Sequence, residues 1–109
     1  MAVTYKNARA ALTTTYGMVY TCPAATTAIV LTAQVANVDG AVSADVSAQW
    51  LDDSAADVAT RLVDGLSVPA KNAVGLLDGP ITLEANDQFQ AKASAAGDLE
   101  LTLSICEIT

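Results

Sequence analysis

Strict alternation of apolar and polar side chains near the end of the chain restricts its fold more than any other feature of the sequence. From residue 99 to 105 every second residue is Leu or Ile, and the residues between them are Glu, Thr or Ser. Successive side chains of a β-strand point to opposite faces of the sheet, so this pattern describes a strand with one buried face. We therefore predict that residues 99–108 form a strand in the centre of the core.

The same period of two recurs along most of the chain. Residues 29–36 and 46–50 alternate in this way on either side of Asp39-Gly40, a dipeptide typical of tight turns, which predicts a β-hairpin. We expect further strands between clusters of turn-forming residues, at positions 8–13, 17–22, 59–68, 73–77, 80–83 and 89–94. Such evenly spaced short strands are typical of antiparallel sandwiches. The prediction is an all-β chain: one jelly-roll-like antiparallel β-sandwich domain over residues 1–109, with about eight strands.

Two segments fit this scheme less well. Residues 52–62 carry apolar side chains at helical spacing behind Asp53 or Ser54, either of which can cap a helix, so a short helix is the alternative to a turn there. Residues 1–7 show no comparable pattern, which indicates a flexible N-terminal arm. Within this arm, Val3 and Tyr5 are candidates for contacts with a neighbouring subunit.

The charge of the chain restricts its partners. Twelve acidic and five basic residues give a net charge of -7, and the resulting field repels phosphate backbones and anionic membrane surfaces. We therefore expect neither nucleic acid nor a membrane as a partner. Lys6 and Arg9 interrupt the start of the chain, unlike a signal peptide, and the most apolar stretch, residues 28–38, is far shorter than the roughly 20 residues of a spanning helix.

Side chains on which many catalytic and metal sites depend are scarce. The chain has no His and two Cys, so the common catalytic triads and zinc sites cannot be assembled. Cys22 and Cys106 stand far apart in the sequence, and we expect both to be buried free thiols. The acidic group at residues 52–57 lacks the spacing of a calcium loop and is interpreted as solvated, and Trp50 is interpreted as a core residue. We expect no enzymatic activity, no cofactor and no metal.

Aromatic residues are few, and the tyrosines lie in the first part of the chain. Tyr16 and Tyr20 stand four positions apart and are interpreted either as an exposed contact pair or as residues at the edge of the sandwich. Together with Val3 and Tyr5 they form our set of possible subunit contacts. These tyrosines would also have to supply the stacking surface if the chain bound a carbohydrate.

Four segments share their turns with a known class of protein. They are the Pro-Ala turn of residues 20–24, the Asn-x-Asp-Gly turn of residues 35–40, the acidic turn of residues 83–87, and residues 93–99, which lead into the last strand. In this order they resemble the small β-rich virion proteins of tailed bacteriophages. Glycine is more usual in that pattern where this chain has Asn86, a residue that tolerates the same left-handed backbone.

This resemblance implies a virion structural protein, and first of all a capsid decoration or cement protein that binds and stabilises the head through protein–protein contacts. Such a protein would be made in the host cytoplasm and would contact the major capsid protein in the virion. It would also form a homo-oligomer, for example a trimer. The alternatives are a tail, neck or fibre-associated protein and a carbohydrate- or receptor-binding module. Independently of the resemblance, a strand-rich chain must either protect its sheet edges or use them, and symmetric assembly is a common use.

Overall fold

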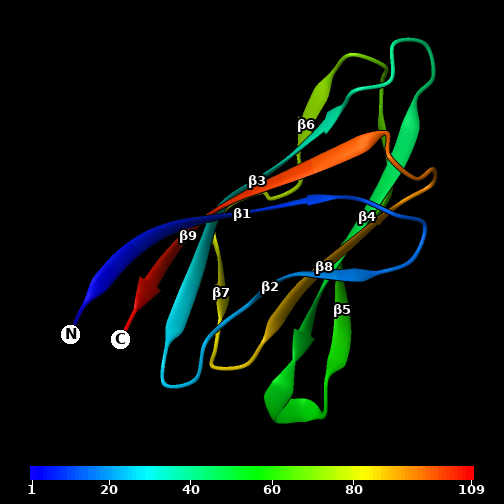
Figure 1. The fold of residues 1–109 in the computed structure, drawn as a ribbon. Coiled ribbons are helices and arrows are strands. Elements are labelled where there is room, and N and C mark those ends of the chain that lie inside the picture. Colours follow the sequence, from blue (N-terminus) through cyan, green and yellow to red (C-terminus); the bar gives the residue numbers. More distant parts are fainter.

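The computed structural model describes residues 1–109. In it the chain folds into two antiparallel sheets packed face to face (Figure 1). One sheet has the strand order β1-β9-β3-β6, with β7 also paired to β3, and the other has the order β2-β8-β4-β5. The all-β antiparallel sandwich predicted from the sequence is confirmed. Its strands are β1 (Val3–Ala11), β2 (Gly17–Thr21), β3 (Thr27–Asn37), β4 (Ala44–Asp52), β5 (Val58–Val68), β6 (Ala73–Gly75), β7 (Ile81–Leu83), β8 (Gln88–Ala93) and β9 (Leu99–Ile108).

Most connections carry the chain from one sheet to the other, and this gives the sandwich its topology. Only the β4–β5 and β6–β7 connections stay within one sheet. β6 and β7 pair with different stretches of β3, so the two short strands share one position at that edge. Counted as one, they leave four strands in each sheet, in the order of an eight-stranded jelly roll.

The last strand lies at the centre of its sheet, between β1 and β3. Its inward side chains Leu99, Leu101, Leu103 and Ile105 are at most 1% exposed, as the alternation predicted. They belong to a cluster of 19 buried residues that also includes Phe89 of the opposite sheet. Burial of large aliphatic side chains between the two sheets is therefore the main stabilising term of the fold.

The hairpin predicted around Asp39-Gly40 is wrong. β3 and β4 belong to different sheets, and residues 38–43 cross between them. The carboxylate of Asp39 accepts hydrogen bonds from the backbone of Ala41 (2.8 Å) and Val42 (3.1 Å), which stabilises this crossing loop. In a hairpin both apolar faces would need cover from other elements, whereas here the inward faces of β3 and β4 pack into one shared core.

The flexible arm predicted for residues 1–7 is corrected as well, because residues 3–7 are the first half of β1. This strand pairs with β9 without any register shift, from Val3 opposite Ile108 to Ala11 opposite Glu100. β1 lies at the edge of the sheet, and most of its side chains are exposed. An edge strand held by its backbone does not need a clear apolar face, and for that reason the sequence pattern does not reveal it.

Residues 52–62 form a turn and the start of β5 in place of the alternative helix. One helical turn, η1 (Asp53–Ala55), is capped by Asp52, whose side chain accepts a hydrogen bond from the backbone of Ser54. Ala56 then takes the left-handed conformation with φ of 58°, which ends the turn. The structure contains no helix with the length and hydrophobicity that crossing a membrane would require.

Candidate functional site: tyrosines, strand edges and grooves

The possible subunit contacts lie in three separate places. Val3 and Tyr5 are on the outer side of β1, where their side chains are 48% and 74% exposed. Tyr16 precedes β2, and Tyr20 lies within β2, in the other sheet. Only Val3 and Tyr5 therefore share one exposed surface.

Tyr20 points into the sandwich and contributes to a partly buried polar contact. Its hydroxyl donates a hydrogen bond to Glu107 of β9, and Glu107 also forms an ion pair with Lys6 of β1 at 3.2 Å. The Tyr20 hydrogen bond, assisted by Lys6, outweighs burial and holds the pKa of Glu107 below its ordinary value. Burial and the Glu107 hydrogen bond raise the pKa of Tyr20. The three side chains thus link three strands at one end of the interior.

This polar contact was not predicted from the sequence, although the sequence contains a signal for it. Glu107 continues the inward phase of β9, two positions beyond Ile105, so its carboxylate must enter the interior or its mouth. Buried carboxylates are normally paired with a cation or a hydrogen-bond donor. The period of two therefore indicates that Glu107 has a partner, but it does not indicate which residue that partner is.

Tyr16 lies on the outer face of the second sheet, between two cations. The Tyr16 ring centroid is 4.8 Å from Nζ of Lys92 and 5.4 Å from Cζ of Arg61, within the range of cation–π contacts. The Tyr16 hydroxyl is buried and has no hydrogen-bond partner in the protein. Arg61 also donates a hydrogen bond to Gln49 (3.2 Å), and Gln49 donates one to Gln90 (2.8 Å). Since Tyr16 and Tyr20 serve opposite faces of one sheet, they do not form a joint contact pair.

The strand edges differ strongly in length and regularity. β2 has five residues with a register shift between Met18 and Tyr20, and β5 pairs with β4 through two register shifts. β5 also contains Gly65 in a left-handed conformation, with φ of 73°. β6 and β7 have three residues each. β1, with nine residues in unbroken register, is the longest regular edge of the molecule.

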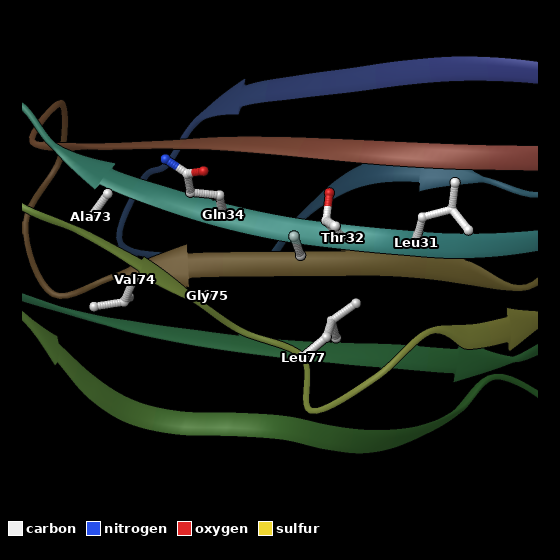
Figure 2. Close-up of a pocket in the computed structure, with 8 residues that line it drawn as sticks. Leu31, Thr32, Gln34, Ala73, Val74, Gly75 and Leu77 are labelled. Atoms are coloured by element: carbon white, nitrogen blue, oxygen red, sulfur yellow. The ribbon is translucent and has the colours of Figure 1, made fainter.

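A groove lies beside β3 at the edge of the first sheet, where β6 ends before β7 begins (Figure 2). Its volume is about 450 Å³, and Leu31, Thr32 and Gln34 of β3 line one side while Val74 and Leu77 line the other. Figure 2 shows these side chains along two roughly parallel segments. The groove offers apolar contacts together with the hydroxyl of Thr32 and the amide of Gln34.

One group of carboxylates is close enough to share a cation. Oxygens of Asp52, Glu84 and Asp87 lie within 4.8 Å of one another. The two oxygens of Asp87, however, each accept a backbone hydrogen bond at 2.9 Å, one from Asp53 and one from Glu84. Asp87 is buried and joins the β4–β5 turn to the turn before β8, which gives this carboxylate a structural role.

Both cysteines are free, as the sequence analysis predicted. Cys22 is fully buried in the core cluster, and its thiol donates to the backbone carbonyl of Thr26 at 3.3 Å. Burial raises the pKa of the Cys22 thiol. Cys106 follows the inward residue Ile105 and lies on the outer face of β9, so the two sulfurs are on different sides of the sheet.

Comparison with known proteins identifies likenesses of fold only. The sequence matches no known family and no curated protein sequence. Its structure is similar to a chain in the acidic stable capsid structure of Helicobacter pylori bacteriophage KHP30. That likeness has a TM-score of 0.59 and 13% identity, and it covers 100% of this chain and 89% of that one. A second similar chain comes from Bacillus endospore appendages, which form disulfide-linked pili. Here the TM-score is 0.58, the identity is 12%, and 99% of this chain and 87% of that one are covered.

Proposed function

We propose that this protein is a structural subunit of a bacteriophage virion, and specifically a capsid decoration or cement protein. The observation that carries the proposal is the full-length likeness to a chain of a phage capsid, with a TM-score of 0.59 over 100% of this chain. The resemblance in turn pattern to small virion proteins supports the same role. In this role the protein acts through protein–protein contacts with further copies and with other virion proteins, and it needs no catalytic chemistry.

The surface of the sandwich supports a role in assembly. Several large apolar side chains are exposed, among them Tyr5 (74%), Met18 (57%) and Val58 (58%). Burial of such side chains would be favourable, so their exposure is typical of a surface that contacts another protein. They lie on β1, β2 and β5, the outer strands of the two sheets. Packing against neighbouring subunits would remove this apolar surface from water.

The test is the composition of the parent particle. Purified particles are expected to contain the chain in a copy number comparable to that of the major capsid protein, as measured by quantitative mass spectrometry. Particles made without the gene should lose heat stability, and added purified protein should restore it. Absence of the chain from the particles would overturn the virion role. A copy number far below that of the capsid protein would overturn the decoration role in favour of a tail or neck component.

A pilus or filament subunit is the second candidate, because the likeness to the Bacillus endospore appendage chain is equally complete. It predicts that the purified protein assembles into filaments of regular diameter, visible by negative-stain electron microscopy. Particles rich in the chain, together with no filaments, would exclude it.

A carbohydrate-binding module is less well supported, since Tyr16 and Tyr20 face opposite sides of their sheet.

A further inference from the structure

The backbone of β1 presents unpaired hydrogen-bonding groups along one side. Ala2 and Thr109 exchange two backbone hydrogen bonds (3.1 and 2.9 Å), and Leu12 donates to Leu99 (2.9 Å). Bonded and non-bonded pairs alternate in an antiparallel ladder, so the even-numbered residues of β1 bond to β9. The N–H and C=O groups of the odd-numbered residues therefore point away from the sheet. These residues are Val3, Tyr5, Asn7, Arg9 and Ala11.

β1 also lacks most of the features by which edge strands usually avoid pairing. Proteins protect such edges with short strands, prolines, bulges or charged side chains, lysine above all. The other edges of this sandwich are short or carry register shifts. β1 has nine residues without proline or a register shift. Of its two charged side chains, Lys6 is already paired with Glu107, and Arg9 is the one that any partner strand must accommodate.

We propose that the free edge of β1 pairs with β1 of a second copy of this chain, antiparallel and about a two-fold axis at Asn7. This contact would join the β1 sheets of the two subunits into one continuous sheet. The inference deepens the proposed function, because it names the surface through which the structural subunit associates with itself.

The positions of the free groups select this register. The five outward-facing residues of β1 are centred on Asn7, so the two-fold register there uses every free N–H and C=O of both strands. It places Lys6 opposite Ala8 of the partner subunit, and Arg9 opposite Tyr5 of the partner subunit. Registers centred on Lys6 or Arg9 would set identical cations opposite each other, which is unfavourable, and they would use fewer hydrogen bonds. In this register the strand is complementary to itself in hydrogen bonding and sets no two cations directly opposite each other.

Amide exchange in the purified protein tests the contact directly. At high concentration, the N–H groups of Tyr5, Asn7 and Arg9 should exchange as slowly as those of Lys6 and Ala8. On dilution below the dissociation constant found by sedimentation velocity, only the odd-numbered amides should become fast. A protein that stays monomeric at millimolar concentration, or that dimerises while its odd-numbered amides exchange quickly, would overturn the proposal.

Two matched variants test the edge at its centre. Asn7→Pro removes an outward N–H without removing a bond to β9, and proline is tolerated at the free side of an edge strand. We expect its dimer to dissociate at least tenfold more readily, while its melting temperature under monomeric conditions stays close to that of the natural chain. Asn7→Ala keeps the N–H and should dimerise normally. Equal dimerisation of the proline variant, shown to be folded by its amide spectrum, would refute the contact.

A charge exchange at Tyr5 tests the register. Tyr5→Glu places a carboxylate opposite Arg9 of the partner subunit twice in each dimer, whereas Tyr5→Lys places a second cation there. Both variants lose the same aromatic ring, so their difference reports the charge pair. The lysine variant should dissociate at least fivefold more readily than the glutamate variant at low salt. Equal dissociation constants would overturn the register centred on Asn7.

Incorporation into particles separates this inference from the proposed function. Particles that bind the natural chain but not folded Asn7→Pro would support both. Particles that bind the two equally would overturn the edge contact and leave the virion role intact. Particles without the chain would overturn the virion role, and the solution measurements would still decide the edge contact. A third result would also overturn the pairing of two copies. If the free protein is monomeric and its odd-numbered β1 amides exchange slowly only when it is bound to a particle, another protein occupies the edge.

Discussion

Among single residues, Glu107 has the most demanding environment. The residue is 7% exposed, yet it carries a charge at the end of an otherwise apolar strand face. The hydrogen bond from Tyr20 and the ion pair with Lys6 offset the cost of removing this charge from water. Because these partners come from β2 and β1, the contact also joins β9 to the opposite sheet and to its neighbouring strand at one end of the sandwich.

Replacing this carboxylate should change how stability depends on pH. The folded-state pKa of Glu107 is depressed, so its contribution is fully present above the ordinary pKa of 4.5 and is lost as the pH falls through the lowered value. We expect Glu107→Gln to cost about 1 kcal/mol at pH 7, because the amide still accepts the Tyr20 hydrogen bond. This difference should shrink as the pH falls below 4.5 and through the lowered pKa of Glu107. Denaturant unfolding across this range measures it, and exposed Glu100→Gln on the same strand is the control. A difference that persists at low pH would contradict the assignment.

Leu103 tests the packing of the core at a single position. It is 0% exposed in the middle of β9. Leu103→Ala should lower the free energy of unfolding by roughly 2–5 kcal/mol, the range for truncation in a packed core. Thr102→Ala, on the exposed face of the same strand, should change it by less than about 0.5 kcal/mol. Denaturant unfolding compares the two, and similar values for both would mean that the inward face of β9 is not the centre of the core.

At the level of the elements, β1 differs most from its expected form. Its first half has no apolar face, and its place in the structure rests on backbone pairing with β9 and on the Lys6 ion pair. Since backbone hydrogen bonds form with almost any side chain, such a strand leaves little trace in the sequence. The same property leaves its other side free for a partner.

Removal of residues 2–7 should therefore destabilise the isolated fold. The truncation removes the ladder from Val3 to Asn7 and exposes the edge of β9. We expect the melting temperature to fall by more than about 5 °C, which corresponds to about 1 kcal/mol in a domain of this size. The double substitution Val3→Thr and Tyr5→Thr keeps the backbone and should change the melting temperature little. An unchanged melting temperature after truncation would mean that this part of β1 contributes no stability.

For the whole molecule, the jelly-roll order places the two thiols in different environments. Cys22 lies between the sheets, whereas Cys106 lies on the outer face of β9, with Tyr5 and Ile29 as its cross-strand neighbours. A bridge between them would have to pass through the first sheet. The separation of the thiols is thus a consequence of the topology and does not follow from their spacing in the sequence.

Thiol labelling should report this arrangement. Without reductant, the denatured chain should show two reactive thiols, the number of cysteines in the sequence. In the native protein, labelling of Cys22 should follow global unfolding, while Tyr5→Ala should speed labelling of Cys106 only. Peptide mass spectrometry separates the two sites. Fewer than two thiols after denaturation would indicate a disulfide, and equal acceleration at both sites would contradict their placement on opposite faces.

The sequence by itself determined the features that depend on local periodicity. Alternation is a property of each strand alone, so β9 was predicted with its bounds, and its buried face was predicted correctly. Asn86 was expected to accept a left-handed turn and has φ of 70°. Glycine tolerates this conformation because it has no Cβ, and asparagine because its short polar side chain can form hydrogen bonds locally, whatever the surrounding fold.

Only the tertiary structure decided which strands pair. The alternation in β3 and β4 fits a hairpin and a sheet-to-sheet crossing equally well, since both leave one face of each strand buried. The choice depends on β8 and β9, distant strands that occupy the neighbouring positions in the two sheets. The orientation of Tyr16 and Tyr20 is likewise a tertiary feature. Their four-residue spacing does not predict the register shift that lies between Met18 and Tyr20. Pairing energy is summed over the whole sandwich, and for that physical reason no local pattern contains it.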